Sequence, residues 1–285
     1  MRIGLATCRD LPDWEVDDRP LHEALQARAV DLHHPVWDDD AVDWDAFDAV
    51  LIRTTWDYME RQEEFAAWAE RVPRLLNPAH IVRWNTHKSY LRDLPSHHVA
   101  PTIWLFKGDT FDLSELPEGR HFIKPQVGAT ARETLRFVPG DPRAQAHLDR
   151  LLTTEDVMVQ PYLSKVETEG EVSAIFIDGA ISHCVRKIPN PGDYRVQDDF
   201  GAKDEPTTFS PAQRALAMNV WDRLFPHLLY GRVDLLALDD GTPVVTEVEL
   251  VEPSLFFRHG PGAAERLADA LLARVPSLRQ GTGNP

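Results

Sequence analysis

The chain has 285 residues, of which 43% are hydrophobic and 27% charged, so it has the composition of a globular protein with two or three domains. Its formal net charge of −16 disfavours nucleic acid and anionic membranes as partners and favours a small molecule. The two cysteines, Cys8 and Cys184, lie far apart, and no apolar run approaches the roughly 18 residues of a membrane span. We therefore expect a cytoplasmic protein with reduced cysteines, and the composition leaves its oligomeric state open, a homo-oligomer included.

The first 85 or so residues are expected to form a small α/β unit. Residues 3–8 and 49–52 are apolar runs typical of strands, and residues 20–28 and 65–72 carry apolar side chains at helical spacing. Residues 53–58 follow the second strand. Ligands of open α/β sheets bind beyond the carboxyl ends of strands, so this segment is a candidate substrate contact. An equally good interpretation is that its Thr or Asp caps the next helix while Trp56 and Tyr58 pack beneath it.

The middle of the chain predicts a small antiparallel β-rich domain. Before it, residues 81–91 indicate a helix with Lys88 near its beginning. The domain itself is indicated by short β-type runs and one helical segment, namely strands at 102–105, 121–125, 134–138 and 157–160 and a helix at 142–152. The small-residue loop 124–132 could approach phosphates through its backbone N–H groups, although it lacks the Gly-Lys-Ser/Thr ending of a Walker A loop.

After residue 160 the patterns indicate hairpins and helices. Residues 170–177 and 180–185 flank an Asp-Gly turn, and Ser210-Pro211 is a typical helix start. Residues 186–209 show no regular element, and their leading cations favour a lid over anions rather than a mobile surface loop. A last helix is expected at 263–275, followed by a frayed tail at 277–285.

A late acidic hairpin is the strongest chemical signal in the chain. Two strand-like runs, 231–238 and 246–254, flank the turn sequence Asp-Asp-Gly. Alternation places Glu247 and Glu249 on one face, while Asp234 lies inside an apolar run, where an unpaired carboxylate is costly. Three converging acids require cations, and hard oxygen ligands suit Mg²⁺. The alternative is a solvated acidic face on an edge hairpin.

The order and spacing of several motifs resemble the ATP-grasp superfamily, on its glutathione-synthetase and RimK-like side. These motifs are Lys88, Lys124-Pro125, Gln160-Pro161-Tyr162-Leu163, Gly170-Glu171, Arg195, Arg232-Val233-Asp234 and Glu247-Val248-Glu249. The resemblance implies a three-domain α/β (α+β) architecture: an N-terminal α/β domain (1–92), a small β-rich lid domain (93–160) and a C-terminal antiparallel-sheet domain (161–285). It also implies ATP bound between the last two domains.

By the same resemblance, each motif has an expected role. Lys88 and Lys124 would contact the phosphates, and Lys124 would also lie near the adenine. The adenine edge would bind the hinge residues Gln160, Pro161, Tyr162 and Leu163, and Glu171 would bind the ribose. Arg195, with Lys187, would neutralise the triphosphate, and Mg²⁺ would be held by Asp234, Glu247 and Glu249. Arg195 and Arg232 are the expected catalytic residues. Two features depart from the family: relatives often have more glycines around 128–130, and often Asn in place of Glu249.

The resemblance implies an ATP-dependent ligase that activates a small-molecule carboxylate as an acyl phosphate and couples it to a nitrogen. The sequences around 53–58, 170–173 and 252–255 look most like small bacterial ligases that include cyclo-ligases forming D-cycloserine from O-ureido-D-serine. We expect Thr54, Thr55, Arg232 and Ser254 to face the substrate; the alternatives are helix capping, a hairpin ion pair and a turn hydroxyl. A small-molecule kinase and a non-catalytic nucleotide-binding protein are the competing functions.

Overall fold

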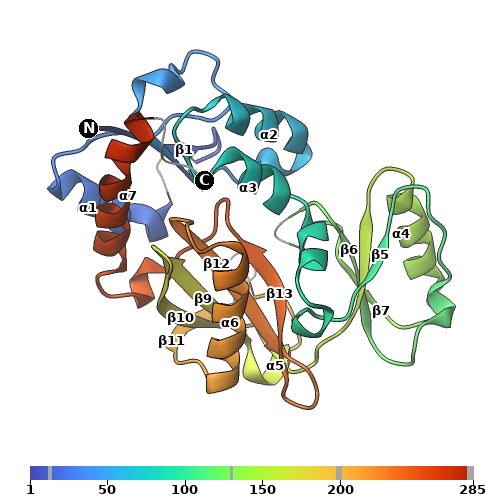
Figure 1. Cartoon of the computed structure of the whole chain (residues 1–285). Coiled ribbons are helices and arrows are strands. Elements are labelled where there is room, and N and C mark those ends of the chain that lie inside the picture. The colour runs from blue at the N-terminus through green and yellow to red at the C-terminus, as the bar shows by residue number, and fades with distance from the viewer. Residues whose placement is uncertain (12–14, 129–130, 197–200, 281–285) are drawn as a thin grey trace.

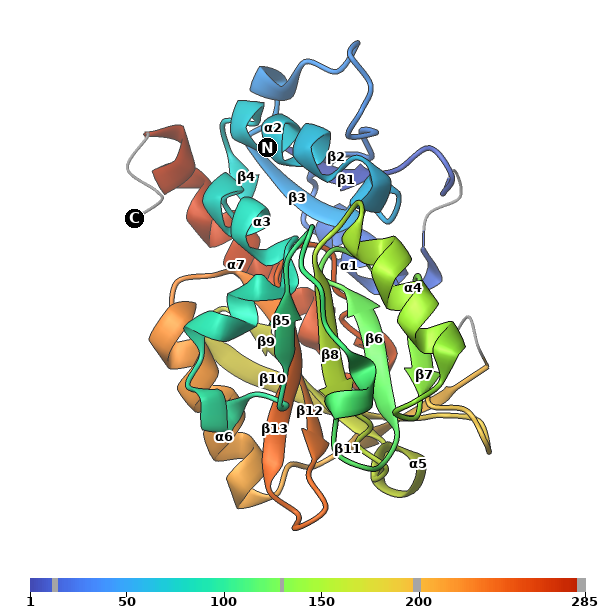
Figure 2. The same ribbon diagram turned by 90° about the vertical axis from the view of Figure 1, so that its right-hand side faces the viewer.

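The fold is built on three β-sheets, seen from two directions in Figures 1 and 2. The structure, a computed structural model, describes residues 1–11, 15–128, 131–196 and 201–280. In Figure 2 the sheet of the middle segment stands in front of the C-terminal sheet, and the N-terminal sheet lies above both. This arrangement confirms the predicted α/β fold with one parallel and two antiparallel sheets.

The N-terminal sheet is parallel, in the order β2 (Asp31–His33), β1 (Arg2–Thr7), β3 (Ala49–Thr54) and β4 (Leu75–Leu76). Strand β3 is buried along its whole length, as expected for a parallel strand covered on both faces. Helix α1 (Arg19–Ala27) follows β1, α2 (Gln62–Arg71) follows β3, and α3 (Ala79–Asn85) follows β4. The sequence patterns found β1, β3 and the first two helices, but they missed β2 and β4, which are too short to show a period.

The middle sheet is antiparallel, in the order β5 (Ile103–Leu105), β8 (Val157–Pro161), β6 (His121–Pro125) and β7 (Leu135–Phe137). Helix α4 (Pro142–Leu152) packs on it through Leu148 and Leu151, which join Ile123 and Val159 in one apolar core. The helix begins where predicted, because Asp141 accepts a hydrogen bond from Arg143 N at 2.9 Å and Pro142 occupies the first turn.

The C-terminal sheet is antiparallel, in the order β11 (Lys203–Thr207), β10 (Ala180–Ile188), β9 (Glu171–Ile177), β12 (Tyr230–Ala237) and β13 (Pro243–Glu249). The short α5 (Val166–Glu169) leads into β9, and α6 (Pro211–Leu224) packs its Leu216 and Val220 against the sheet. The β12–β13 register pairs Asp234 with Glu247 and Arg232 with Glu249, so the predicted acidic hairpin is present.

The prediction that residues 186–209 lack regular structure is wrong in part. Strand β10 continues to Ile188 and β11 pairs with it along the sheet edge. The pattern was hidden because both strands are polar here: the ion pair between Arg186 and Glu205 joins them in place of an apolar contact. Residues 197–200 lie outside the described residues, and so do Ala129 and Thr130 of the predicted phosphate loop and residues 281–285 of the predicted tail.

The helix expected at 81–91 is two separate elements. Helix α3 ends at Asn85, and a 3₁₀ helix, Lys88–Asp93, follows it. The helical backbone ladder breaks where Lys88 N donates to Gln126 O at 2.7 Å, and the Asn85 side chain bonds to β13 and the residue after it, donating to Val248 O at 2.8 Å and accepting from Leu250 N at 2.7 Å. Lys88 is therefore the first residue of the short 3₁₀ helix, and its side chain pairs with Glu247 of the acidic hairpin.

Long-range contacts join the N-terminal and C-terminal sheets. Helix α7 (Ala263–Arg279) lies beside α1, so both ends of the chain complete one core (Figure 1). Its last turns extend past the predicted end at 275 and include the first three residues of the predicted tail. The buried Asn77 donates to the carbonyls of Tyr230 and Leu250, both at 2.8 Å, which fixes the acidic hairpin against β4.

Candidate active site

A cavity of about 570 Å³ lies where the three sheets meet. Its walls include Lys124 from β6, Gln160 from β8, Glu171 from β9, Lys187 from β10 and the inner face of the β12–β13 hairpin. Trp56 and Tyr58, from the segment after β3, also line the cavity. The structure thus brings nearly all of the predicted site residues to one space.

The hairpin acids form one cluster. Carboxylate oxygens of Asp234, Glu247 and Glu249 lie within 4.8 Å of one another. Val248 and Leu250, on the opposite face of β13, are buried in the core, as the alternation of the sequence indicates. Three carboxylates from two paired strands make a set of hard oxygen ligands at the floor of the cavity.

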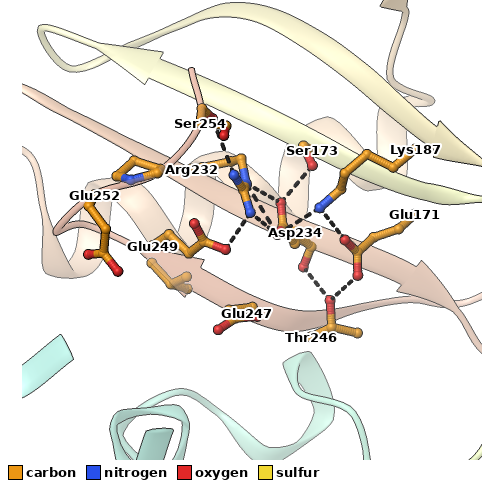
Figure 3. A network of polar contacts seen from close by, with 12 residues as sticks. Glu171, Ser173, Lys187, Arg232, Asp234, Thr246, Glu247, Glu249, Glu252 and Ser254 are labelled. Carbon is orange, nitrogen blue, oxygen red and sulfur yellow. Dashed lines mark hydrogen bonds and ion pairs between the residues drawn. The ribbon is translucent and has the colours of Figure 1, made fainter. Parts of the chain in front are cut away.

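Cations hold the buried Asp234 in place (Figure 3). Arg232 donates to it in a forked arrangement, Nε to Oδ1 at 2.9 Å and Nη2 to Oδ2 at 3.0 Å, and Lys187 Nζ reaches Oδ2 at 3.1 Å. Ser173 Oγ donates to Oδ1 at 2.6 Å. Burial alone raises the pKa of Asp234, but Arg232 and Lys187 outweigh it and hold this pKa well below the ordinary value. Asp234 is therefore ionised at neutral pH.

The other two acids are less fully compensated. Glu247 is paired with Lys88, and Glu249 with Arg232. Burial, reinforced by Glu247 and Asp234 and only partly offset by Arg232, raises the pKa of Glu249 to about 8. With this pKa the Glu249 carboxyl keeps a proton at neutral pH in the metal-free protein, and a hard divalent cation would displace that proton. The residues present thus fit Mg²⁺ by donor type, spacing and charge.

The predicted nucleotide-binding residues line the opposite side. Lys124, at the end of β6, lies over the Phe122 ring at 4.9 Å, and burial lowers its pKa. Gln160, Pro161, Tyr162 and Leu163 follow one another along the cavity wall; Gln160 Nε2 donates to Thr102 Oγ1 at 2.8 Å, and Tyr162 N to Arg120 O at 2.8 Å. The ring of Phe122 and the side chains of Met158 and Leu236 supply apolar surface, as an aromatic base requires.

Glu171, Lys187 and Arg195 complete this side. Lys187 bridges Glu171 and Asp234, so it links the predicted ribose acid to the metal cluster. Burial raises the pKa of Glu171 despite the neighbouring Lys187. Arg195 stands at the cavity wall and pairs with Asp193 at 2.7 Å.

The structure places Thr54 and Thr55 away from the cavity, whereas the sequence predicted that they face the substrate. Both are buried, at 1% and 0% exposure, and neither lines the cavity; Thr54 Oγ1 donates to Thr7 Oγ1 at 2.7 Å. The strand β3 runs through Thr54, so its side chain packs between neighbouring strands instead of opening into the loop. Ser254 does line the cavity, and its carbonyl accepts a hydrogen bond from Arg232 at 3.2 Å.

Several cavity residues were not selected from the sequence. Trp56 and Tyr58 were interpreted with equal weight as packing residues, and Glu252, Phe256 and Arg258 were given no role. For Glu252 a signal was available, because it continues the acidic series Glu247, Glu249 on the same segment. The other residues gave no such signal in the sequence, because they reach the cavity only through the tertiary fold.

A small antiparallel sheet over an acidic hairpin, with lysines between them, defines the ATP-grasp class of enzymes. Residues 3–77 match the family described as D-cycloserine synthetase DcsG, N-terminal domain, and residues 111–254 match the prokaryotic glutathione synthetase ATP-grasp domain. The cycloserine biosynthesis protein DcsG of Streptomyces lavendulae is 35% identical over 92% of this chain and 94% of its own length.

Solved structures agree with this match. The crystal structure of D-cycloserine synthetase DcsG covers 96% of this chain and 100% of its own, with a TM-score of 0.85 and 32% identity. A RimK domain ATP-grasp protein from Sphaerobacter thermophilus covers 95% of this chain and 100% of its own with a TM-score of 0.68, and at 21% identity it shows the fold alone. The chain belongs to the ATP-grasp ligases of the glutathione-synthetase type, and it is an ATP-dependent enzyme that joins a carboxylate to a nitrogen. In the described part of the chain, no helix combines the length and the hydropathy that crossing a membrane requires.

Proposed function

We propose that this enzyme activates the carboxylate of O-ureido-D-serine and closes the molecule to D-cycloserine. The observation that carries the proposal is the likeness to DcsG, which extends over nearly the whole chain and includes the N-terminal unit, where ATP-grasp enzymes differ from one another. The N-terminal unit contributes Tyr58 and Trp56 to the cavity wall, and the part of the cavity that they line is proposed to be its substrate end.

The nucleotide is proposed to lie between the middle and C-terminal sheets. Lys88, Lys124, Lys187 and Arg195 would meet its phosphates, Glu171 its ribose hydroxyls, and residues 160–163 its adenine edge, while Asp234, Glu247 and Glu249 would hold Mg²⁺. The domain limits 1–92, 93–160 and 161–285 belong to the same proposal, each domain taking one of the three sheets.

The chain's own residues would act by position and charge. When bound, Mg²⁺ supplies charge neutralisation at the triphosphate. Lys88 and Lys124 stand on the cavity wall, where charge develops as the substrate carboxylate attacks the γ-phosphorus. Arg232, held by Asp234 and Glu249, is oriented toward the substrate end by its bond to Ser254 O. The cavity holds the acyl phosphate beside the attacking nitrogen, which makes ring closure a positioned reaction.

The test is an assay of the purified chain with Mg–ATP and O-ureido-D-serine, in which ADP, phosphate and D-cycloserine are measured separately. O-Ureido-L-serine and D-serine serve as controls for the substrate. We expect equal amounts of ADP, phosphate and D-cycloserine. Formation of ADP without free phosphate would instead indicate a kinase, and nucleotide binding without turnover would indicate a binding protein.

A further inference from the structure

Glu252 is a cavity carboxylate with no part in the metal cluster. It follows β13 and lines the end of the cavity shared with Trp56 and Tyr58. In Figure 3 it stands at the end of the row of acids away from Glu171, and no contact joins it to the other residues drawn. Among the described residues it has no Lys, Arg or His within ion-pair distance.

The N-terminal unit fixes the position of this carboxylate. The hydroxyl of Tyr58 hydrogen-bonds to the Glu252 side chain, and Trp56 Nε1 donates to Glu252 O at 3.4 Å. The next carbonyl, Pro253 O, accepts from the buried Arg53 at 2.9 Å. Three contacts, one from the end of β3 and two from the segment after it, thus hold the Glu252 segment at the substrate end of the cavity.

The setting of Glu252 is that of a proton acceptor. Burial raises the pKa of Glu252 to about 7, reinforced by Glu247 and partly offset by the Tyr58 hydrogen bond and by Lys88. A carboxylate with such a pKa takes up and releases a proton near neutral pH, where a general base is most effective.

The other acids that line the cavity in the described part of the chain are already engaged in contacts of their own. Asp17 pairs with Arg258 at 2.7 Å, Glu171 pairs with Lys187, and Glu15 accepts a hydrogen bond from Asp17 N at 3.2 Å. The remaining three form the metal cluster. Lys88 and Lys124 are placed to carry positive charge toward the phosphates. Glu252 is therefore the described carboxylate at the substrate end that is available to accept a proton.

We propose that Glu252 is the base that removes the proton from the attacking nitrogen, and that Tyr58 positions its carboxylate. The inference rests on the proposed function. In the step, the substrate nitrogen forms a bond to the acyl carbon, and the bond between that carbon and the phosphate oxygen breaks. The phosphate leaves with the electron pair, and the proton of the nitrogen passes to Glu252. The ring nitrogen then still carries the carbamoyl group of the ureido substituent, and water removes this group as carbon dioxide and ammonia to give D-cycloserine. A urea-type nitrogen is a weak nucleophile while it keeps this proton, so ring closure needs the base, whereas formation of the acyl phosphate does not.

The experiment separates these two steps with hydroxylamine, a nucleophile strong enough to trap an acyl phosphate without a base. Wild type, Glu252→Gln and Tyr58→Phe are supplied with Mg–ATP, O-ureido-D-serine and hydroxylamine. ADP, D-cycloserine and the linear hydroxamate are quantified by mass spectrometry. Glu63→Gln, on the outer face of α2 with its side chain 86% exposed, is the matched surface control.

We expect Glu252→Gln to slow ring closure by about 10²–10⁴-fold, the usual contribution of a general base, while ADP release with hydroxylamine stays within a few-fold of wild type. The product then shifts from D-cycloserine to hydroxamate. Tyr58→Phe shifts the ratio of D-cycloserine to hydroxamate in the same direction by a smaller factor. This variant tests the Tyr58–Glu252 pair even if Glu252→Gln folds poorly. A parallel fall of ADP, D-cycloserine and hydroxamate in the two variants would overturn the assignment. Wild-type enzyme that forms neither ADP nor hydroxamate would instead refute the proposed function itself.

Discussion

Asp234→Asn tests how the cavity floor is held together. The wild-type carboxylate is 2% exposed and accepts hydrogen bonds from Arg232, Lys187 and Ser173. The substitution keeps the shape of the side chain but leaves two buried cations with less negative charge. Removing one partner of a buried ion pair costs about 3–5 kcal/mol. We expect the lower value, about 3 kcal/mol, because the amide oxygen of the asparagine still accepts a hydrogen bond from the cations.

This loss is measurable by thermal unfolding without nucleotide. For a chain of this size each kcal/mol corresponds to roughly 2 °C, so the Tm should fall by about 6 °C. Ser173→Ala, which removes one hydrogen bond to the same carboxylate, should cost only about 1 kcal/mol. A Tm of Asp234→Asn within 1–2 °C of wild type, or no lower than that of Ser173→Ala, would refute the view that Asp234 neutralises Arg232 and Lys187.

Further predictions concern a buried ion pair, the pH dependence of the unfolding free energy, and nucleotide binding. Arg53→Met leaves the buried Asp18 unpaired and should lower the free energy of unfolding by about 3–5 kcal/mol, whereas Arg53→Met with Asp18→Leu should recover most of the loss in denaturant titrations. The raised pKa values of Glu252 (about 7) and Glu249 (about 8) mean that these two groups stabilise the folded metal-free protein at low pH and lose this contribution as the pH rises from about 5 to 8. Histidines such as His34, whose pKa burial lowers to about 4, act in the opposite direction, so the comparison is between wild type and Glu252→Gln. The unfolding free energy of wild type minus that of the variant should fall over this range, and a rise would contradict the assignment. Lys124→Met removes a buried charge beside Phe122, so calorimetry should show Mg–ADP binding weakened by roughly 10–100-fold with an unchanged or higher Tm.

The sequence was sufficient for the acidic hairpin because local patterns determine it. The Asp-Asp-Gly turn fixes the β12–β13 connection, and strict alternation separates Glu247 and Glu249 from Val248 and Leu250. The capped helices α4 and α6 were predictable for the same reason: Asp141-Pro142 and Ser210-Pro211 are helix starts that the structure uses, the second with a full capping box.

The substrate end could not be predicted in this way. Whether Thr54 points into a loop or between strands depends on where β3 ends, and that is decided by its pairing with β1. Tyr58 reaches Glu252 across nearly two hundred residues of sequence, and Arg53 reaches Asp18 and Pro253 O through the same tertiary arrangement. Such long-range contacts produce no periodic pattern in the sequence, since each partner, taken alone, cannot be distinguished from any other polar residue.

Calorimetric titration of the purified chain with a non-hydrolysable ATP analogue is the most direct test of the central claim. The claim is that Asp234, Glu247 and Glu249 hold the divalent ion that anchors the triphosphate beneath the middle sheet. We predict binding in the presence of Mg²⁺, much weaker binding in EDTA, and loss of the Mg²⁺-dependent part in Glu247→Gln. Equal affinity with and without Mg²⁺, or no binding at all, would contradict the claim.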